Sequence, residues 1–192
     1  MAKKESSLSN MISTLLIITL VASAALAGVY NLTKEPIAAA ARIKTENAIR
    51  QVIPPFDRLE RLAVMPADGP DSLIIYRGLK GDSLVGTAVQ TYSYKGFSGY
   101  IGIMVGFKAD GSINDIAVLA HKETPGLGTK LAEPKFKDQF KNLNIGELTG
   151  QRVKVTKDQG TIEAITAATI SSRAFCDAVQ RAWENQKKGG EK

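Results

Sequence analysis

The residues best suited to chemistry lie in segment 163–171, which reads Glu-Ala-Ile-Thr-Ala-Ala-Thr-Ile-Ser. Two alanines precede Thr169, so nothing bulky beside it in the sequence hinders approach to its hydroxyl. Apolar residues then recur at helical spacing and predict a helix that begins at this segment: Phe175, Ala178, Val179, Ala182 and Trp183. A helix start offers unpaired N–H groups and partial positive charge. The segment is therefore either a phosphate site with an accessible threonine or an ordinary helix cap.

Three segments together resemble the covalent FMN proteins of bacterial respiration. Segment 163–169 is similar to their attachment motif Asp-x-x-Ser/Thr-Gly-Ala-Thr, but Glu163 replaces Asp and Ala167 replaces Gly. Segment 121–128 is similar to their His-x-Glu-Thr-Pro-Gly-Leu-Gly signature, and segment 96–107 also resembles the family. Within it, the chain most resembles the G subunit of the Rnf ion-translocating oxidoreductase. The C subunit of the sodium-pumping NADH:quinone reductase shares these motifs but is usually longer.

The resemblance implies a redox subunit of a translocase complex, with FMN joined to Thr169 through a phosphoester bond that a flavin transferase installs. It implies a complex that moves electrons between reduced ferredoxin and NAD⁺, coupled to sodium or proton transport. The single apolar span of this chain contains no ionisable residue. Other membrane subunits must therefore supply the ion path. The flavin brings the redox chemistry, and the protein supplies position and electrostatics.

If Thr169 holds the phosphate, the flavin ring must lie against a nearby loop, and the loop after His121 is the best candidate. Its glycines let backbone amides approach a ligand closely, Leu127 offers an apolar contact, and Thr124 can donate a hydrogen bond. We therefore expect a cofactor-binding set of Thr169, Thr166, Ala167, Ala168, His121, Glu123, Thr124, Leu127 and Gly128.

Several residues keep two interpretations. His121 can tune the flavin or hold the loop backbone, because imidazole titrates near neutrality and also accepts hydrogen bonds. Glu123 is expected to hold the loop through N–H groups, since pure electron transfer needs no general base. Thr166 can bond the phosphate or the helix start. Lys154 and Lys157 can complement the phosphate, although solvated surface lysines are commoner.

Two other functions compete with the Rnf-type subunit. One is a different exported flavin protein, such as the quinone reductase subunit, and co-purifying partners would separate these. The other is an anchored binding module without flavin, in which the turn at Thr169 merely caps a helix.

Composition excludes several classes of function. The net charge is +6, but the basic residues are scattered and no basic run is interleaved with aromatics, so nucleic acid binding is not expected. Cys176 is the only cysteine, which excludes an intramolecular disulfide and favours a small buried side chain. His121 is the only histidine, and no metal-ligand cluster or hydrolytic motif occurs.

Residues 11–30 are almost wholly apolar and long enough to span a bilayer. Lys3 and Lys4 precede this span, and the positive-inside tendency places them in the cytoplasm and the rest of the chain on the periplasmic side of the bacterial inner membrane. A cleaved signal peptide is the alternative, because residues 22–24 and 25–27 fit the small-x-small cleavage pattern. Either interpretation exports the domain.

The remaining pattern predicts an α+β protein: one transmembrane helix, then a single domain with a mainly antiparallel sheet and packed helices. Strands are expected at 73–77, 84–94, 100–107, 113–120 and 153–155, and helices at 34–53, 131–141 and from the 169–171 region onward. The predicted divisions are a cytoplasmic N-terminus (1–10), a transmembrane helix (11–30), a linker helix and connecting segment (31–72), the FMN-binding domain (73–186) and a flexible tail (187–192).

Overall fold

The computed structural model describes residues 7–187, except for the side chain of Thr149. Lys3 and Lys4, and the predicted flexible tail beyond Lys187, lie outside the described residues. The described part forms two compact units that divide between Ile43 and Lys44.

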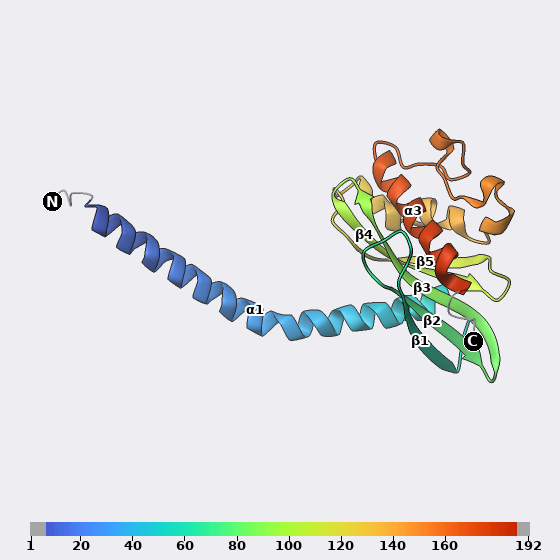
Figure 1. Cartoon of the computed structure of the whole chain (residues 1–192), viewed down its shortest axis with the longest axis horizontal. Coiled ribbons are helices and arrows are strands. Elements are labelled where there is room, and N and C mark those ends of the chain that lie inside the picture. Colours follow the sequence, from blue (N-terminus) through green and yellow to red (C-terminus); the bar gives the residue numbers. More distant parts are fainter. Residues whose placement is uncertain (1–6, 188–192) are drawn as a thin grey trace. The chain divides into compact units, whose positions relative to one another are not determined.

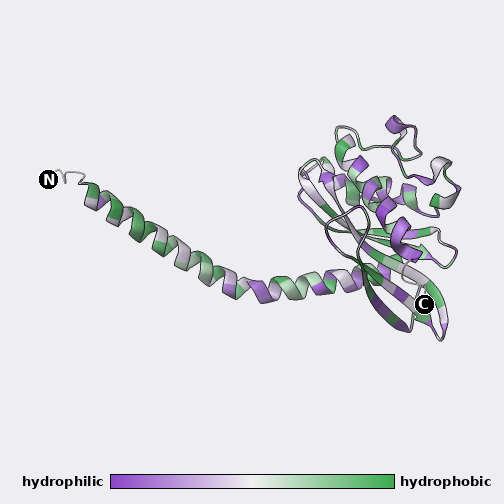
Figure 2. Ribbon diagram, viewed as in Figure 1, coloured by the Kyte–Doolittle hydropathy of each residue, from purple (hydrophilic) through white to green (hydrophobic). Residues whose placement is uncertain are grey.

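Helix α1 (Leu8–Val52) is one continuous helix of 45 residues, apolar over its first half (Figure 2). It is long and apolar enough to cross a membrane, with a mean hydropathy of 2.3 over its most apolar stretch. The prediction of a separate helix that opens at Lys34–Pro36 was wrong, because Pro36 lies inside α1. The proline ring fits helical backbone angles, so its effect is local: it removes one N–H bond and crowds the preceding turn.

The domain is built on a five-stranded antiparallel meander in the order β1-β2-β3-β4-β5, which confirms the predicted fold class (Figure 1). The strands are β1 (Arg58–Val64), β2 (Leu73–Lys80), β3 (Ser83–Gly96), β4 (Gly99–Lys108) and β5 (Ile113–His121). The last four match the predicted strands. Strand β1 was not predicted: it is an edge strand with mostly exposed side chains.

Alternate strand residues point to opposite sides of the sheet. Other parts of the domain pack on each side and bury both faces. On one face, Val89 and Val105 pack with helix α3 (Thr169–Gln186) and the segment that precedes it. On the other face, Ala88 and Met104 pack against the C-terminal end of α1, where Val52 is fully buried. A Cβ atom at Gly106 would lie 1.9 Å from the Val52 carbonyl oxygen, so this close approach requires glycine.

Short turns connect β5 to α3 in place of the helix predicted at 131–141. They are η1 (Gly128–Ala132), α2 (Pro134–Lys137), η2 (Asp138–Phe140), η3 (Ile145–Glu147), η4 (Thr149–Gln151) and η5 (Thr156–Asp158). Pro134 is the reason for the break, since a residue before proline avoids helical angles and Glu133 is extended, at φ −73° and ψ 143°. The strand predicted at 153–155 is reduced to a single bridge between Val155 and Ile162.

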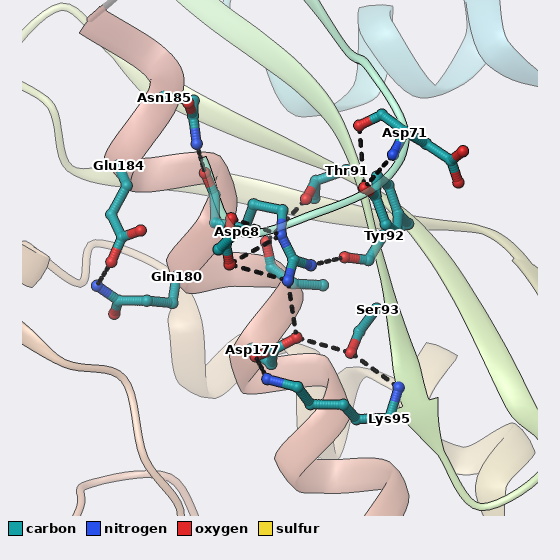
Figure 3. A network of polar contacts seen from close by, with 12 residues as sticks. Asp68, Asp71, Thr91, Tyr92, Ser93, Lys95, Asp177, Gln180, Glu184 and Asn185 are labelled. Carbon is teal, nitrogen blue, oxygen red and sulfur yellow. Dashed lines mark hydrogen bonds and ion pairs between the residues drawn. The ribbon is translucent and has the colours of Figure 1, made fainter. Parts of the chain in front are cut away.

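A polar network fixes α3 to the sheet and to the β1–β2 connection (Figure 3). The buried guanidinium of Arg181 pairs with Asp68 at 3.0 Å, donates to the Tyr92 carbonyl, and lies 5.1 Å from the centre of the Tyr92 ring. Asp177, one turn earlier on α3, accepts a hydrogen bond from Ser93 of β3 at 2.8 Å. The network therefore sets the position of α3, and with it the first turn of that helix.

Candidate functional site

A pocket of about 320 Å³ opens where three segments of the domain meet. The β3–β4 turn contributes Phe97, and the start of α3 with the residues before it contributes Thr169. The loop after β5 contributes Glu123. The structure thus brings together most of the residues predicted from the sequence; the full lining is Phe97, Glu123, Thr124, Leu127, Gly128, Ala167, Ala168, Thr169, Ile170 and Ser171.

Thr169 is the first residue of α3 and does not act as its cap. The cap position belongs to Ala168, whose side chain has no hydrogen-bonding atom. Thr169 is partly exposed, and its hydroxyl accepts a hydrogen bond from the Lys157 ammonium, with Nζ and Oγ1 3.2 Å apart. The ordinary-cap interpretation of this threonine was therefore wrong, and its hydroxyl lies at the pocket beside a cation.

The loop before Thr169 is held by hydrogen bonds at both ends. The Ser172 hydroxyl accepts from the Ile165 N–H and donates to the Ala168 carbonyl, each at 3.0 Å. Gln139 brackets the main chain of Glu163, donating to its carbonyl at 3.2 Å and accepting from its N–H at 2.7 Å. These bonds fix the shape of the loop, and the Thr169 hydroxyl is hydrogen-bonded outside the loop, to Lys157.

Ala167 has a left-handed backbone, with φ of 62°. An L-residue with a Cβ atom pays roughly 1–2 kcal/mol in this conformation, whereas glycine adopts it freely. The covalent FMN motif carries glycine at this position. The alanine that replaces it here therefore has a strained backbone conformation.

Glu123 connects the three segments of the pocket although it is only 5% exposed. One carboxylate oxygen accepts from the Ser98 N–H at 3.2 Å, and the other accepts from the Ser171 hydroxyl at 2.6 Å. A Cβ atom at Gly128 would lie 2.3 Å from the Glu123 Cβ, so the loop can close over this side chain only with glycine there. These contacts agree with the expectation that Glu123 holds the loop.

His121 lies outside the pocket lining, at the end of β5. Its Nδ1 accepts a hydrogen bond from the Glu123 N–H at 3.3 Å. This contact agrees with the interpretation that His121 holds the loop backbone. Thr124 and Leu127 form the next turn, in which the Leu127 N–H donates to the Thr124 carbonyl at 3.2 Å. Leu127 is 39% exposed and presents an apolar side chain at the pocket.

Thr166 does not line this pocket. It contributes instead to a neighbouring hollow of about 290 Å³ between its own loop and the 130–139 segment. Among the predicted site residues, Thr166 and His121 are therefore the two that the structure separates from the pocket.

Three lining residues were missed from the sequence. Phe97 and Ile170 are apolar yet 69% and 48% exposed, and Ser171 is the buried partner of Glu123. A signal existed for each: Phe97 sits between the glycines of the segment 96–99, and Ile170 and Ser171 directly follow Thr169. Together with Leu127, the exposed side chains of Phe97 and Ile170 give the pocket an apolar wall.

Cys176 is buried on α3, and burial raises the pKa of its thiol to about 12. It therefore stays protonated at neutral pH and behaves as the small buried side chain predicted. Across residues 7–187 the structure brings together no group of three or more histidine, cysteine, aspartate or glutamate residues that could hold a metal ion.

The domain and the whole chain match known proteins. Residues 96–184 match the FMN-binding domain family. The G subunit of the ion-translocating oxidoreductase complex of Methanosarcina acetivorans is 30% identical over 178 residues, which cover 91% of this chain and 92% of that protein. The G subunit of the proton-translocating ferredoxin:NAD(+) oxidoreductase complex of Clostridium ljungdahlii is 30% identical over 183 residues, or 95% and 93% of the two chains.

Among solved structures, that of Shewanella oneidensis NqrC aligns with 67% of this chain and 70% of its own, with a TM-score of 0.49 and 19% identity. The two G subunits match this chain over nearly its full length, from the N-terminal membrane-crossing helix to the FMN-binding domain. The chain belongs to the family of G subunits of the ion-translocating oxidoreductase complexes.

Proposed function

We propose that this chain is a membrane-anchored electron carrier with FMN joined covalently to Thr169, working as one subunit of a ferredoxin:NAD oxidoreductase complex that translocates ions. The observation that carries the proposal is the state of the Thr169 hydroxyl. It caps no helix, lies at a pocket with an apolar wall, and has an ammonium 3.2 Å away.

The residues at the pocket fit the two ends of FMN. A phosphate suits the Thr169 end, where the first N–H groups of an 18-residue helix have no partner within the helix and Lys157 adds positive charge. A flat, largely apolar ring suits the apolar wall of the same pocket, where Leu127, Phe97 and Ile170 are exposed. When bound, FMN supplies one- and two-electron chemistry; the chain binds and orients it.

The remaining residues have positioning roles in this proposal. Glu123 holds the loop to α3, and His121 holds the Glu123 N–H, so neither is needed as an acid or a base. Gly128 lets the loop close over Glu123. Thr124 lines the pocket, while Ala167 and Ala168 belong to the turn that presents Thr169.

We propose that the apolar part of α1, residues 11–30, lies in the bacterial inner membrane with the N-terminus in the cytoplasm. The FMN-binding domain then lies on the periplasmic side, where the flavin transferase meets it. A covalent bond suits that compartment, because a dissociated cofactor would be lost there. The ion path belongs to the other membrane subunits, since residues 11–30 contain no Asp, Glu, Lys, Arg or His.

The test is flavin fluorescence of the denatured protein band on a gel, after export together with a flavin transferase. We expect a fluorescent band for the wild type and for Thr166→Ala, and no fluorescence for Thr169→Ala. A dark wild-type band, with a known covalent flavoprotein labelled in the same cells, would overturn the proposal and favour an anchored binding module. Partners that co-purify with the fluorescent protein distinguish an Rnf-type complex from a quinone reductase.

A further inference from the structure

We propose that Lys157 is the residue that pairs with the phosphoester on Thr169 and fixes the orientation of the flavin's phosphate end. The inference rests on the proposed attachment at Thr169. It assigns the cation that pairs with the negative charge of the phosphate. Lys157 is distant from Thr169 by 12 residues in sequence, yet its ammonium is the donor that reaches the Thr169 hydroxyl.

The loop that carries Lys157 is firmly built. Its ends are joined by the bridge between Val155 and Ile162, both of which are buried at about 1% exposure. The Gly160 N–H donates to the Val155 carbonyl at 3.0 Å, and a Cβ atom at Gly160 would lie 2.0 Å from the Lys154 carbonyl oxygen. These contacts close the turn tightly. Lys157 lies in this turn, in the short helix η5.

An ion pair fastens this loop to α3 close to Thr169. Asp158, the residue after Lys157, accepts two hydrogen bonds from Arg173, at 2.7 Å from Nε and 2.6 Å from Nη2. Two parallel bonds from a guanidinium fix distance and direction together. Since Arg173 is one turn along α3 from Thr169, the pair sets the distance between Lys157 and the threonine hydroxyl.

The neighbouring guanidinium of Arg173 is committed to Asp158. Its hydrogen bonds lower the pKa of that carboxyl. Among the described residues, the ammonium of Lys157 has Thr169 as its hydrogen-bond partner, and two of its three N–H donors remain for a further acceptor. A phosphoester on Thr169 would place its charged oxygens next to those donors.

A cation at Lys157 adds to what the helix start alone offers a phosphate. A hydrogen bond between charged groups is stronger than one between neutral groups, and a phosphate esterified at both ends keeps one negative charge at neutral pH. The first N–H groups of α3 would hold the phosphate through hydrogen bonds, and the Lys157 ammonium would add a charged donor.

The test compares full-length Lys157→Met, Lys157→Arg and Lys154→Met, each exported with an excess of flavin transferase. Lys154→Met is the matched control, because it removes the same charge from the same loop. The first readout is the ³¹P resonance of the phosphoester in the intact flavoprotein. The second is the rise in thermal midpoint when the flavin is attached, measured against the flavin-free form of each variant.

We expect Lys157→Met to shift the ³¹P resonance and to lose about 3 °C or more of the rise in midpoint, the effect of one charged hydrogen bond in a domain of this size. Lys157→Arg should retain most of both, and Lys154→Met all of both. If Lys157→Met takes up no flavin while its flavin-free form melts like the wild type and Lys154→Met is labelled, the proposal is also supported.

Equal shifts in Lys157→Met and Lys154→Met would overturn the assignment, because they would show a general effect of surface charge. So would an unchanged resonance and midpoint in fully labelled Lys157→Met. A covalent flavin that persists in Thr169→Ala is a different failure: it would remove the proposed attachment site itself and is seen on the gel before any Lys157 variant is compared.

Discussion

The Glu123 carboxylate accepts a hydrogen bond from the Ser171 hydroxyl across 2.6 Å, and this bond ties the loop after β5 to the first turn of α3. The other carboxylate oxygen holds the β3–β4 turn through the Ser98 N–H. Glu123 is more than nine-tenths buried and its partners are neutral donors. The pocket at Thr169 therefore depends on one side chain that three segments share.

We expect Glu123→Gln to lower the free energy of unfolding by about 1–3 kcal/mol. The amide oxygen can still accept from the Ser98 N–H, and the NH₂ group then faces the Ser171 hydroxyl, which must turn round to accept. Both contacts lose the charge of the acceptor, which is the source of the expected loss. Urea unfolding of the full chain in detergent measures the loss. Glu133→Gln, at an exposed position, is the control and should change little. Equal losses in the two variants would show that the Glu123 contacts do not stabilise the domain.

We expect Gly128→Ala to destabilise the domain more than Gly126→Ala does. The new Cβ at residue 128 would lie 2.3 Å from the Glu123 Cβ, a clash of the kind that costs about 1–3 kcal/mol in a tightly packed site. Gly126 has φ of 76° but open space around it, so alanine there is strained without a clash. Thermal midpoints rank the two.

The Gly128 variant carries a second readout, since the clash displaces the residue that holds Ser171. Labelling of Thr169 by flavin on a gel should fall in Gly128→Ala and stay near the wild-type level in Gly126→Ala. The opposite order in either measurement would show that the loop does not need Gly128 in order to close over Glu123.

We expect Ala167→Gly to raise the free energy of unfolding by about 1 kcal/mol, because glycine removes the strain of φ 62° at this position. Ala168→Gly is the control: Ala168 has φ of −132° and is buried, so glycine there adds only flexibility and should destabilise. Chemical denaturation of both variants tests the sign. A loss of stability in Ala167→Gly would mean that the turn does not strain its alanine.

The elements that the sequence predicted are those with a strong period. Strands β2 to β5 alternate or run apolar between turns, and α3 repeats its apolar residues at helical spacing. Strand β1 lacks such a signal, because its leucines at 59 and 62 are three residues apart and most of its side chains are exposed. β1 forms because the chain turns back after Pro54 and Pro55 and pairs with β2. That pairing depends on the tertiary fold and not on a local sequence pattern.

The residues of the site show the same contrast between local sequence patterns and tertiary contacts. The motifs at 121–128 and 163–169 identified the segments that form the pocket, and Thr169 itself. They did not reveal Phe97 or Ser171 as its neighbours, since those contacts depend on how the β3–β4 turn and the start of α3 are placed in the fold. Lys157 was named from the sequence as one of two lysines that can complement the phosphate, and the fold brings its ammonium to Thr169. Thr166 was expected at the site from sequence proximity, but a residue three positions away in a turn can point to another hollow.

Acid sensitivity of the domain should originate in part from Asp177, half-way along α3. Burial alone would raise the pKa of this carboxyl, but hydrogen bonds from Lys95 and Ser93 and the charge of Arg181 outweigh it, so the pKa is lowered in the folded state. A carboxyl with a lowered folded pKa stabilises the fold above its ordinary value of 3.8. That stability is lost as the pH falls through the lower folded value.

We therefore expect the free energy of unfolding to decline as the pH falls below about 4, and the decline to be shallower in Asp177→Asn. The variant should also be less stable than the wild type at pH 7, because it leaves Arg181 and Lys95 without this partner. Asp82→Asn, on the exposed turn between β2 and β3, controls for the loss of a carboxylate. Urea unfolding from pH 7 to pH 3 supplies the curves, and Asp177→Asn and wild-type curves that run parallel throughout would refute the role given to Asp177.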